Sequence, residues 1–128
     1  MTSQPPTRPD RTDAVFVEQR PWGSFQQFVE NENVTVKLIT VLPGSRLSLQ
    51  RHTHREELWQ VLDGTAWTVV DGVERTLGPG ERVLVGVGAM HRLGNPASTP
   101  LRVLEIAFGD FDEADIERFD DDHARPTA

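Results

Sequence analysis

Residues 43–64 read PGSRLSLQRHTHREELWQVLDG, and this stretch decides how the rest of the chain is interpreted. A Pro-Gly pair opens it and an Asp-Gly pair closes it. Asp-Gly between apolar runs is a strong hairpin signal, because glycine takes a positive φ without steric cost. The residues between these turns predict strands over Arg46–His54 and Leu58–Leu62, separated by a short polar segment.

The same alternation of short apolar runs and turn residues continues on both sides of this stretch. Regular strands separated by turn signals are typical of an antiparallel sandwich or barrel, so the chain is expected to be all-β. A short C-terminal helix is predicted over Asp112–Phe119, with Asp112 as its N-cap. The further predicted strands are Phe25–Phe28, Val34–Leu42, Ala66–Val70, Glu74–Leu77, Arg82–Val85 and Leu101–Phe108.

Length and composition narrow the class of protein. A chain of 128 residues corresponds to one domain. We expect a disordered N-terminal arm over residues 1–13 and one domain over residues 14–128 that ends in an acidic tail. The absence of cysteine excludes disulfide scaffolds, thiolate metal sites and a cysteine nucleophile. Any metal ion would therefore be held by nitrogen and oxygen atoms.

The net charge of −7 comes mainly from the C-terminus. Residues 110–128 hold eight acidic residues and two arginines, which leaves twelve acidic and eleven basic residues for the rest of the chain. Without a basic stripe, nucleic acid is not an expected partner. Because no segment approaches the roughly 20 apolar residues of a membrane helix, we expect no membrane partner and a cytoplasmic location.

Three of the four histidines lie in two polar stretches. In a strand, Gln50, His52 and His54 share one face, which would place two imidazoles within reach of one ion. Glu57 follows after a break in the alternation, with Glu56 as the rival carboxylate. His91 comes directly after a Gly-x-Gly turn, whereas His123 lies in the acidic tail, where we expect it to be solvated.

These stretches resemble the two signature motifs of the cupin superfamily. The first motif corresponds to His52-Thr53-His54, Glu57 and Gly64, and the second to Gly80, Gly86-Val87-Gly88, His91 and Asn95. More closely, residues 18–125 resemble the C-terminal cupin domain of type II mannose-6-phosphate isomerase / mannose-1-phosphate guanylyltransferase proteins. The pieces that carry this likeness include Arg20–Ser24, Leu47–Gln50, His52–Trp59, Gly64–Ala66, His91–Leu93 and Asp115–Asp122.

The resemblance implies a single-domain cupin, a double-stranded β-helix or jelly roll. It also implies one divalent ion, Zn, Mn, Fe, Co or Ni, held by His52, His54, Glu57 and His91. The leading hypothesis is aldose–ketose isomerisation of a sugar phosphate, as in mannose-6-phosphate isomerase, by a homodimer. The alternatives are an iron-dependent cupin dioxygenase with the same ligand set and a non-catalytic sugar-binding cupin.

Two departures weaken the transfer of isomerase activity more than the transfer of metal binding. Leu58 stands where the relatives have a histidine, and Gly86 replaces the proline of the second motif. We therefore expect that one polar group near the site is lost and that the turn before His91 is looser.

Five further residues are candidates for the chemistry. Lys37 and Glu105 are candidate catalytic groups, although Lys37 could instead point to solvent and Glu105 could pair with an arginine. Gln50 either touches a sugar hydroxyl or is a satisfied interior amide. Arg46 and Arg55 are candidates for a phosphate clamp, because guanidinium groups match phosphate oxygens bidentately. Arg92 could join this clamp, but because it is adjacent to His91 in a strand it is expected to point away from the site.

Overall fold

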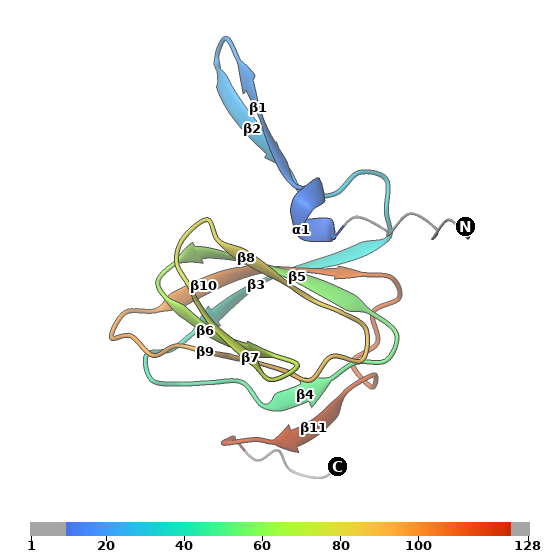
Figure 1. Ribbon diagram of the computed structural model, residues 1–128, viewed down its shortest axis with the longest axis vertical. Coiled ribbons are helices and arrows are strands. Elements are labelled where there is room, and N and C mark those ends of the chain that lie inside the picture. Colours follow the sequence, from blue (N-terminus) through green and yellow to red (C-terminus); the bar gives the residue numbers. More distant parts are fainter. Residues whose placement is uncertain (1–9, 124–128) are drawn as a thin grey trace, which may run out of the picture.

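Two antiparallel sheets face each other in the computed structural model, which describes residues 10–123 (Figure 1). The all-β prediction is confirmed, and non-consecutive neighbours in each sheet give the crossed connections of a jelly roll. The first sheet has the order β3 (Val34–Val41), β10 (Leu101–Phe108), β5 (Glu56–Asp63) and β8 (Arg82–Val85). The second has the order β11 (Glu117–Asp120), β4 (Leu49–Arg51), β9 (His91–Gly94), β6 (Ala66–Val70) and β7 (Val73–Leu77).

The main hydrophobic core lies between the two sheets. Trp59 and Val61 of β5 and Val103 of β10 face Leu93 of β9 and Leu77 of β7, and all five side chains are buried. Each fully buried side chain of this size contributes about 1.5–3 kcal/mol relative to an exposed one. This packed layer holds the strands that carry the polar site in fixed positions.

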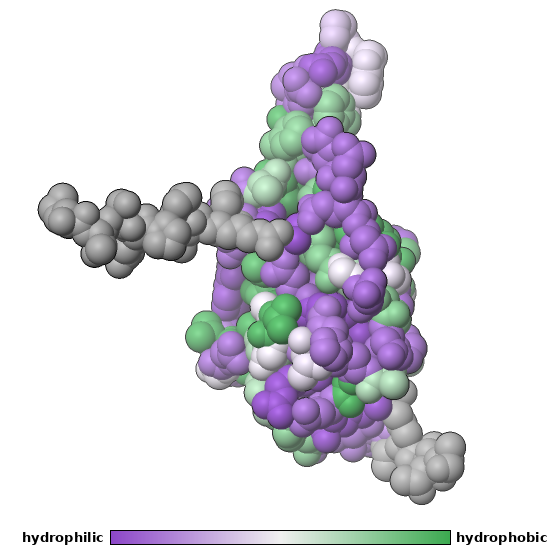
Figure 2. Space-filling view, turned by 90° about the vertical axis from the view of Figure 1, so that its right-hand side faces the viewer, coloured by the Kyte–Doolittle hydropathy of each residue, from purple (hydrophilic) through white to green (hydrophobic). Residues whose placement is uncertain are grey.

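A hairpin of β1 (Phe16–Arg20) and β2 (Gly23–Gln27) projects from the body of the molecule (Figure 1). Its strands pair only with each other. Phe16, Val17 and Trp22 are exposed, Trp22 to 74%, and Figure 2 shows green apolar surface beside purple polar surface on this projection. The homodimer expected above stays a prediction.

The structure differs from the sequence prediction at both ends of the described residues. Residues 1–9 of the predicted arm lie outside the described residues, while Asp10 caps a short helix, α1 (Arg11–Ala14). Residues 112–119, which the structure describes in full, form no helix. Asp112 accepts a hydrogen bond from the Ala114 N–H in a turn, and β11 then pairs with β4. An Asx turn and a helix N-cap use the same local hydrogen bond, so the sequence signal did not separate them.

The predicted strand over Arg46–His54 is shortened to β4, with an isolated bridge between Arg46 and Gly94. The polar segment after β4 leaves the strand because other groups bind its backbone, as shown below. None of the helices among residues 10–123 has the length and apolar character needed to cross a membrane.

Two of the turn glycines allow a matched test of the fold. Gly64 (φ +89°) follows β5, and a Cβ there would lie 2.7 Å from the carbonyl oxygen of Pro100. Gly72 (φ +78°), in the predicted Asp71-Gly72 turn that joins β6 to β7, has open space at that position. We expect Gly64→Ala to lower the free energy of unfolding by at least about 2 kcal/mol and Gly72→Ala by only about 1 kcal/mol. Urea denaturation measures both, and equal losses would contradict the close approach at Gly64.

Candidate metal centre and its cavity

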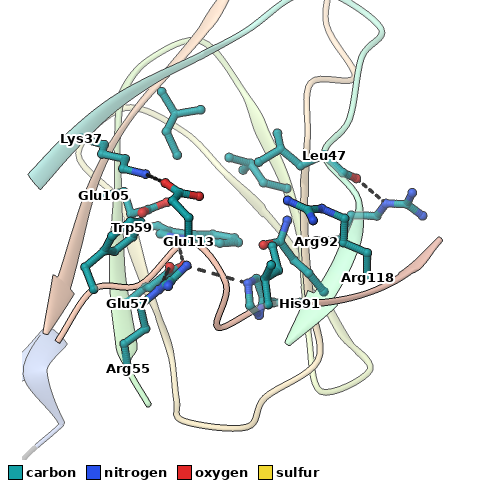
Figure 3. A pocket seen from close by; sticks show the side chains of 15 residues that line it. Lys37, Leu47, Arg55, Glu57, Trp59, His91, Arg92, Glu105, Glu113 and Arg118 are labelled. Atoms are coloured by element: carbon teal, nitrogen blue, oxygen red, sulfur yellow. Dashed lines mark hydrogen bonds and ion pairs between the residues drawn. The ribbon is translucent and has the colours of Figure 1, made fainter. Parts of the chain in front are cut away.

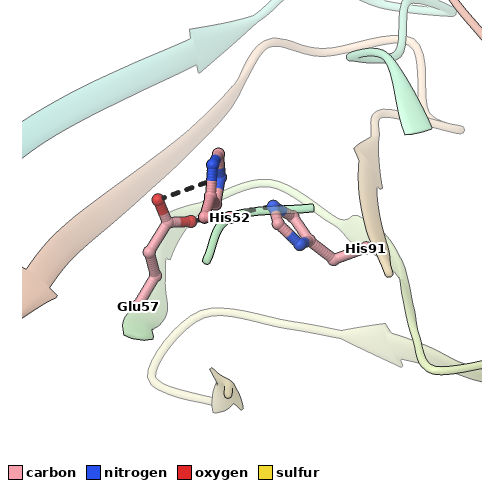
Figure 4. A group of neighbouring side chains, drawn as sticks. All are labelled: His52, Glu57 and His91. Atoms are coloured by element: carbon pink, nitrogen blue, oxygen red, sulfur yellow. Dashed lines mark ion pairs between the residues drawn. The ribbon is translucent and has the colours of Figure 1, made fainter. Parts of the chain in front are cut away.

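Three buried side chains from separate segments converge between the sheets (Figure 4). His52 Nε2 lies 3.5 Å from Glu57 Oε2, and His91 Nε2 lies 3.9 Å from Glu57 Oε1. One ligand atom from each of the three residues lies within 4.8 Å of the others. These residues form a candidate metal-binding group, called the three-donor group below.

Backbone carbonyl groups orient both imidazoles of the three-donor group. His52 Nδ1 lies 2.9 Å from the carbonyl oxygen of Asp115, and His91 Nδ1 lies 2.9 Å from that of Ala89. A carbonyl oxygen only accepts, so each Nδ1 carries the proton and each Nε2 keeps its lone pair. Burial, the largest cause, lowers the pKa of His91 and favours the neutral imidazole.

Asp115 holds the segment after β4. Its carboxylate accepts hydrogen bonds from the Thr53 hydroxyl (2.7 Å), the Thr53 N–H (3.0 Å) and the His54 N–H (2.9 Å). These bonds, led by the one from the Thr53 hydroxyl, lower the pKa of Asp115 to about 2. The backbone amides of the segment are therefore used by a side chain and not by a neighbouring strand.

The structure does not bring His54 into the three-donor group. The strand ends at Arg51, so the alternation that would place His54 beside His52 does not continue. The His54 side chain is exposed and opens into a separate hollow with Arg11 and Glu56. The fourth predicted ligand, His54, is therefore not grouped with the other three in this structure. Gln50, directly opposite His91 in the β4–β9 register, lines the cavity.

Arg55 bridges two members of the three-donor group. Its Nε donates to Glu57 Oε2 (3.0 Å), and its terminal nitrogen NH2 lies 3.3 Å from His52 Nε2. It also donates to the carbonyl oxygen of Asp112 (3.2 Å) and packs on the Phe111 ring. A metal ion would replace two of these hydrogen bonds, and the other two contacts would still hold the guanidinium.

The donor chemistry fits a divalent ion. Two oriented imidazole nitrogens and one carboxylate are a ligand set for zinc and for iron, with open positions left for water or substrate. His91 Nε2 faces Glu57 and accepts no hydrogen bond within residues 10–123. In this structure the Nε2 atom of His91 is therefore free to bind a ligand, whereas Arg55 holds the donor atoms of His52 and Glu57.

A cavity of about 260 Å³ opens beside the three-donor group (Figure 3). Lys37 of β3 and Glu105 of β10, the two candidate catalytic groups, are direct register partners, and both line the cavity. Gln50 lines it too, and its amide nitrogen donates to the Ser48 hydroxyl (3.1 Å). Charged groups of both signs therefore surround this space.

Glu105 is the most perturbed acid in this cavity. Burial, followed by the nearby Glu57 carboxylate, raises its pKa to about 7. It is 8% exposed and forms no hydrogen bond within the described part of the chain, so it does not pair with an arginine. A carboxyl group with a pKa near neutrality can both take and return a proton at physiological pH.

Comparison with known proteins decides the family. The family model "Mannose-6-phosphate isomerase C-terminal" matches residues 10–121. The chain belongs to this family. Mannose-1-phosphate guanylyltransferase ManC of Salmonella typhimurium and alginate biosynthesis protein AlgA of Pseudomonas aeruginosa are each 41% identical to it over 107 residues. These matches cover 83% of this chain but only 22% of either relative, so the chain spans about a fifth of their length.

Solved structures agree with the cupin fold. A cupin 2 domain-containing protein from Halorhodospira halophila is 28% identical, with a TM-score of 0.62 over 72% of this chain and 62% of its own. The capsular polysaccharide assembling protein CapF from Staphylococcus aureus has a TM-score of 0.64 at 19% identity, over 83% of this chain and 34% of CapF. The second likeness supports the fold alone.

Leu58 was expected to remove a polar group from the site, but the structure places this residue elsewhere. Leu58 is fully buried on the other face of β5, against Val15 and Ile106. The side chain at this position therefore packs away from the cavity, in a hydrophobic cluster that does not include the three-donor group.

Two arginines lie where the sequence analysis did not expect them. Arg46 lies outside the cavity of the three-donor group, because Asp122 binds its guanidinium at 2.6 Å and 3.1 Å. Arg92, expected to point away, is buried and lines the cavity, where it donates to the Leu47 carbonyl oxygen (2.7 Å) and to Asp120 (2.9 Å). Of the three arginines considered for a phosphate clamp, Arg55 and Arg92 line the cavity and Arg46 does not.

Sequence reasoning missed the contribution of the C-terminal segment. Phe111, Glu113, Ile116 and Arg118 line the cavity, and Asp115 fixes the loop of His52. The only sequence signal was the resemblance of residues 115–122 to family members, because local patterns there indicated a helix and an acidic tail.

The raised pKa of Glu105 predicts a pH dependence of stability. An acid whose pKa rises from 4.5 to about 7 on folding stabilises the folded state fully below pH 4.5, and this contribution is lost as pH rises through 7. We expect wild type to lose on the order of 2–3 kcal/mol between pH 5 and 8 relative to Glu105→Gln. Urea unfolding across this range checks the loss. Glu30→Gln, which removes an exposed carboxylate, is the control, and parallel profiles for wild type and Glu105→Gln would contradict a buried, unpaired acid.

Proposed function

We propose that this cupin isomerises a sugar phosphate between its aldose and ketose forms, as a metal-dependent enzyme of the mannose-6-phosphate isomerase type. One observation carries the proposal: Glu105, with a pKa of about 7, lines the same cavity as Glu57 and His91, two members of the three-donor group. The family supports the choice of a sugar phosphate, since its description names mannose-6-phosphate isomerase.

The size and charge of the cavity favour a small anionic ligand. Its volume of about 260 Å³ lies just below the range of about 300–1,000 Å³ that is usual for drug-sized ligands. Lys37, Arg55, Arg92 and Arg118 line it. Guanidinium and ammonium groups bind phosphate oxygens strongly when water is excluded.

Isomerisation requires a proton to move between two neighbouring carbons of the sugar. Glu105 is suited to remove the proton from C2 and to return it to C1, because its carboxyl group is half ionised near neutral pH. Burial within the cavity slows exchange of this proton with bulk water. No redox partner is needed, since the oxidation of one carbon is balanced by the reduction of the other.

His52, Glu57 and His91 would hold the divalent ion in this enzyme. Such an ion supplies Lewis-acid polarisation of the carbonyl and hydroxyl oxygens of the sugar. The chain itself provides the oriented donors, and Gln50, opposite His91 in the register, is placed to bind a sugar hydroxyl. Binding of the phosphate would fix the reacting carbons relative to Glu105.

One observation favours a second function. Without His54, the donor set is two histidines and one carboxylate, which is also the ligand set of non-haem iron oxygenases. The cationic lining of the cavity favours the isomerase. Oxygen uptake by the iron-loaded protein with an aromatic or thiol substrate would favour the dioxygenase, and binding of a sugar without turnover would favour a sugar-binding cupin.

Metal binding can be tested with three histidine-to-alanine variants, each of which removes one imidazole ring. We expect His52→Ala and His91→Ala to lower the affinity for Zn²⁺ or Mn²⁺ by at least about tenfold, since each removes one of three donors. His54→Ala should bind as wild type does, because His54 lies outside the group. Isothermal titration calorimetry measures the affinities, and a loss in His54→Ala as large as in the other two would contradict the assignment.

The activity is tested by following fructose 6-phosphate formation from mannose 6-phosphate in a coupled assay. We expect turnover in the presence of Zn²⁺, Mn²⁺ or Co²⁺, and a decrease in kcat of about 10²–10⁴-fold in Glu105→Gln. The affinity of this variant for metal should remain unchanged, which separates proton transfer from damage to the site. Absence of turnover with all three metals, or an undiminished kcat in Glu105→Gln, would overturn the proposal.

A further inference from the structure

Glu113 is the carboxylate of the C-terminal segment that reaches the mouth of the cavity (Figure 3). Lys37 Nζ donates to Glu113 Oε1 at 3.0 Å. The Glu113 side chain is 75% exposed, and ion pairs of this kind are weak in water. The contact therefore places an anionic group over the cavity without binding it tightly.

Three cationic side chains act on this one carboxylate. The hydrogen bond from Lys37, followed by the charges of Lys37, Arg55 and Arg118, lowers the pKa of Glu113. Arg118 lines the cavity and forms no ion pair or hydrogen bond of its own within residues 10–123. The three cations come from β3, the loop before β5 and β11, so the fold brings together cations that are far apart in the sequence.

Phe111 positions two of the three cations. Lys37 Nζ lies 4.1 Å and Arg55 Cζ 4.2 Å from the centre of its ring. Cation–π contacts at this distance hold a charged group in place without using its N–H donors. Lys37 and Arg55 are therefore packed before any ligand arrives.

We propose that Lys37, Arg55 and Arg118 form a phosphate-binding subsite at the mouth of the cavity, and that Glu113 occupies it until the phosphate group of the ligand displaces it. A phosphate group competes well with one carboxylate, because it carries up to two negative charges and has three acceptor oxygens. Arg118 has no partner to give up. This inference rests on the proposed function only in one respect, namely that the phosphate group is attached to a sugar. Binding of the phosphate group itself does not depend on it.

The subsite predicts that removal of the Glu113 charge strengthens phosphate binding. We expect Glu113→Gln to bind inorganic phosphate and mannose 6-phosphate about two- to fivefold more tightly than wild type, since the competing ion pair is lost. Lys37→Gln and Arg118→Gln should each weaken binding, Lys37→Gln by about tenfold. Isothermal titration calorimetry with both probes measures these changes, and thermal melts verify that each variant is folded.

Glu117→Gln is the matched control. It removes the same charge from the same segment, but Glu117 pairs with Arg51 and does not line the cavity. If Glu117→Gln increased the affinity for phosphate as much as Glu113→Gln does, the effect would be due to net charge alone, and the subsite would be overturned. The subsite is also overturned if Glu113→Gln binds phosphate no better than wild type, or if neither protein binds it.

These outcomes are independent of turnover. Tighter phosphate binding in Glu113→Gln without any isomerase activity would retain the subsite and remove the proposed function. Isomerase activity with identical phosphate affinities in wild type and Glu113→Gln would retain the function and remove the subsite.

Discussion

The hydrogen bonds from Thr53 and His54 to Asp115 are the interaction on which the site depends. They end β4 at Arg51 and turn the following segment, so that His52 reaches the carboxylate of Glu57 instead of continuing along a strand. The backbone carbonyl oxygen of Asp115 also accepts a hydrogen bond from His52 Nδ1–H. One residue of the C-terminal segment therefore sets both the path of the loop and the tautomer of a candidate ligand, and its pKa of about 2 keeps it ionised at physiological pH.

Charge balance explains how so many ionisable groups share a small cavity. Arg55 neutralises Glu57 directly, and Trp59 donates to the other oxygen of that carboxylate at 3.1 Å. Glu105 has no such partner within the described residues, and burial, followed by the charge of Glu57, raises its pKa to about 7. A buried ionised group without a partner is costly, so an acid left in this state usually has a function that requires it. The arrangement separates a carboxylate that Arg55 and Trp59 pair in this structure from one that can exchange a proton.

The fold was largely predictable from the sequence because strand and turn signals are local. Asp71-Gly72 and the run Leu101–Phe108 appear in the structure as a turn and a strand. The resemblance to cupins brought His52, Glu57 and His91 together in advance. The fates of His54 and Asp112 were not predictable, because each depends on a contact across the chain: Asp115 ends the strand before His54, and β4 pairs with the segment that follows Asp112. Alternation along a strand is valid only while the strand lasts.

The C-terminal segment shows the same limit on a larger scale. Its composition indicated a solvated acidic tail, yet Phe111 and Glu113 face the cavity and Asp120 binds Arg92. The acidic segment packs against the two sheets because its carboxylates pair with cations at the cavity. Local sequence patterns do not reveal such contacts between distant residues. The functional surface is therefore assembled from both cupin motifs and from a segment that belongs to neither.

Nitrogen-15 NMR of the imidazole rings tests the central claim most directly, namely that His52 and His91 present oriented Nε2 lone pairs to a shared point beside Glu57. The hydrogen bonds predict that the neutral imidazole of both residues is the Nδ1–H tautomer, and that both Nε2 resonances shift when Zn²⁺ is added. His54 and His123 should remain unshifted at the same metal concentration. If His54 or His123 responds to Zn²⁺ while His52 and His91 do not, the three-donor group is not the metal centre of this protein.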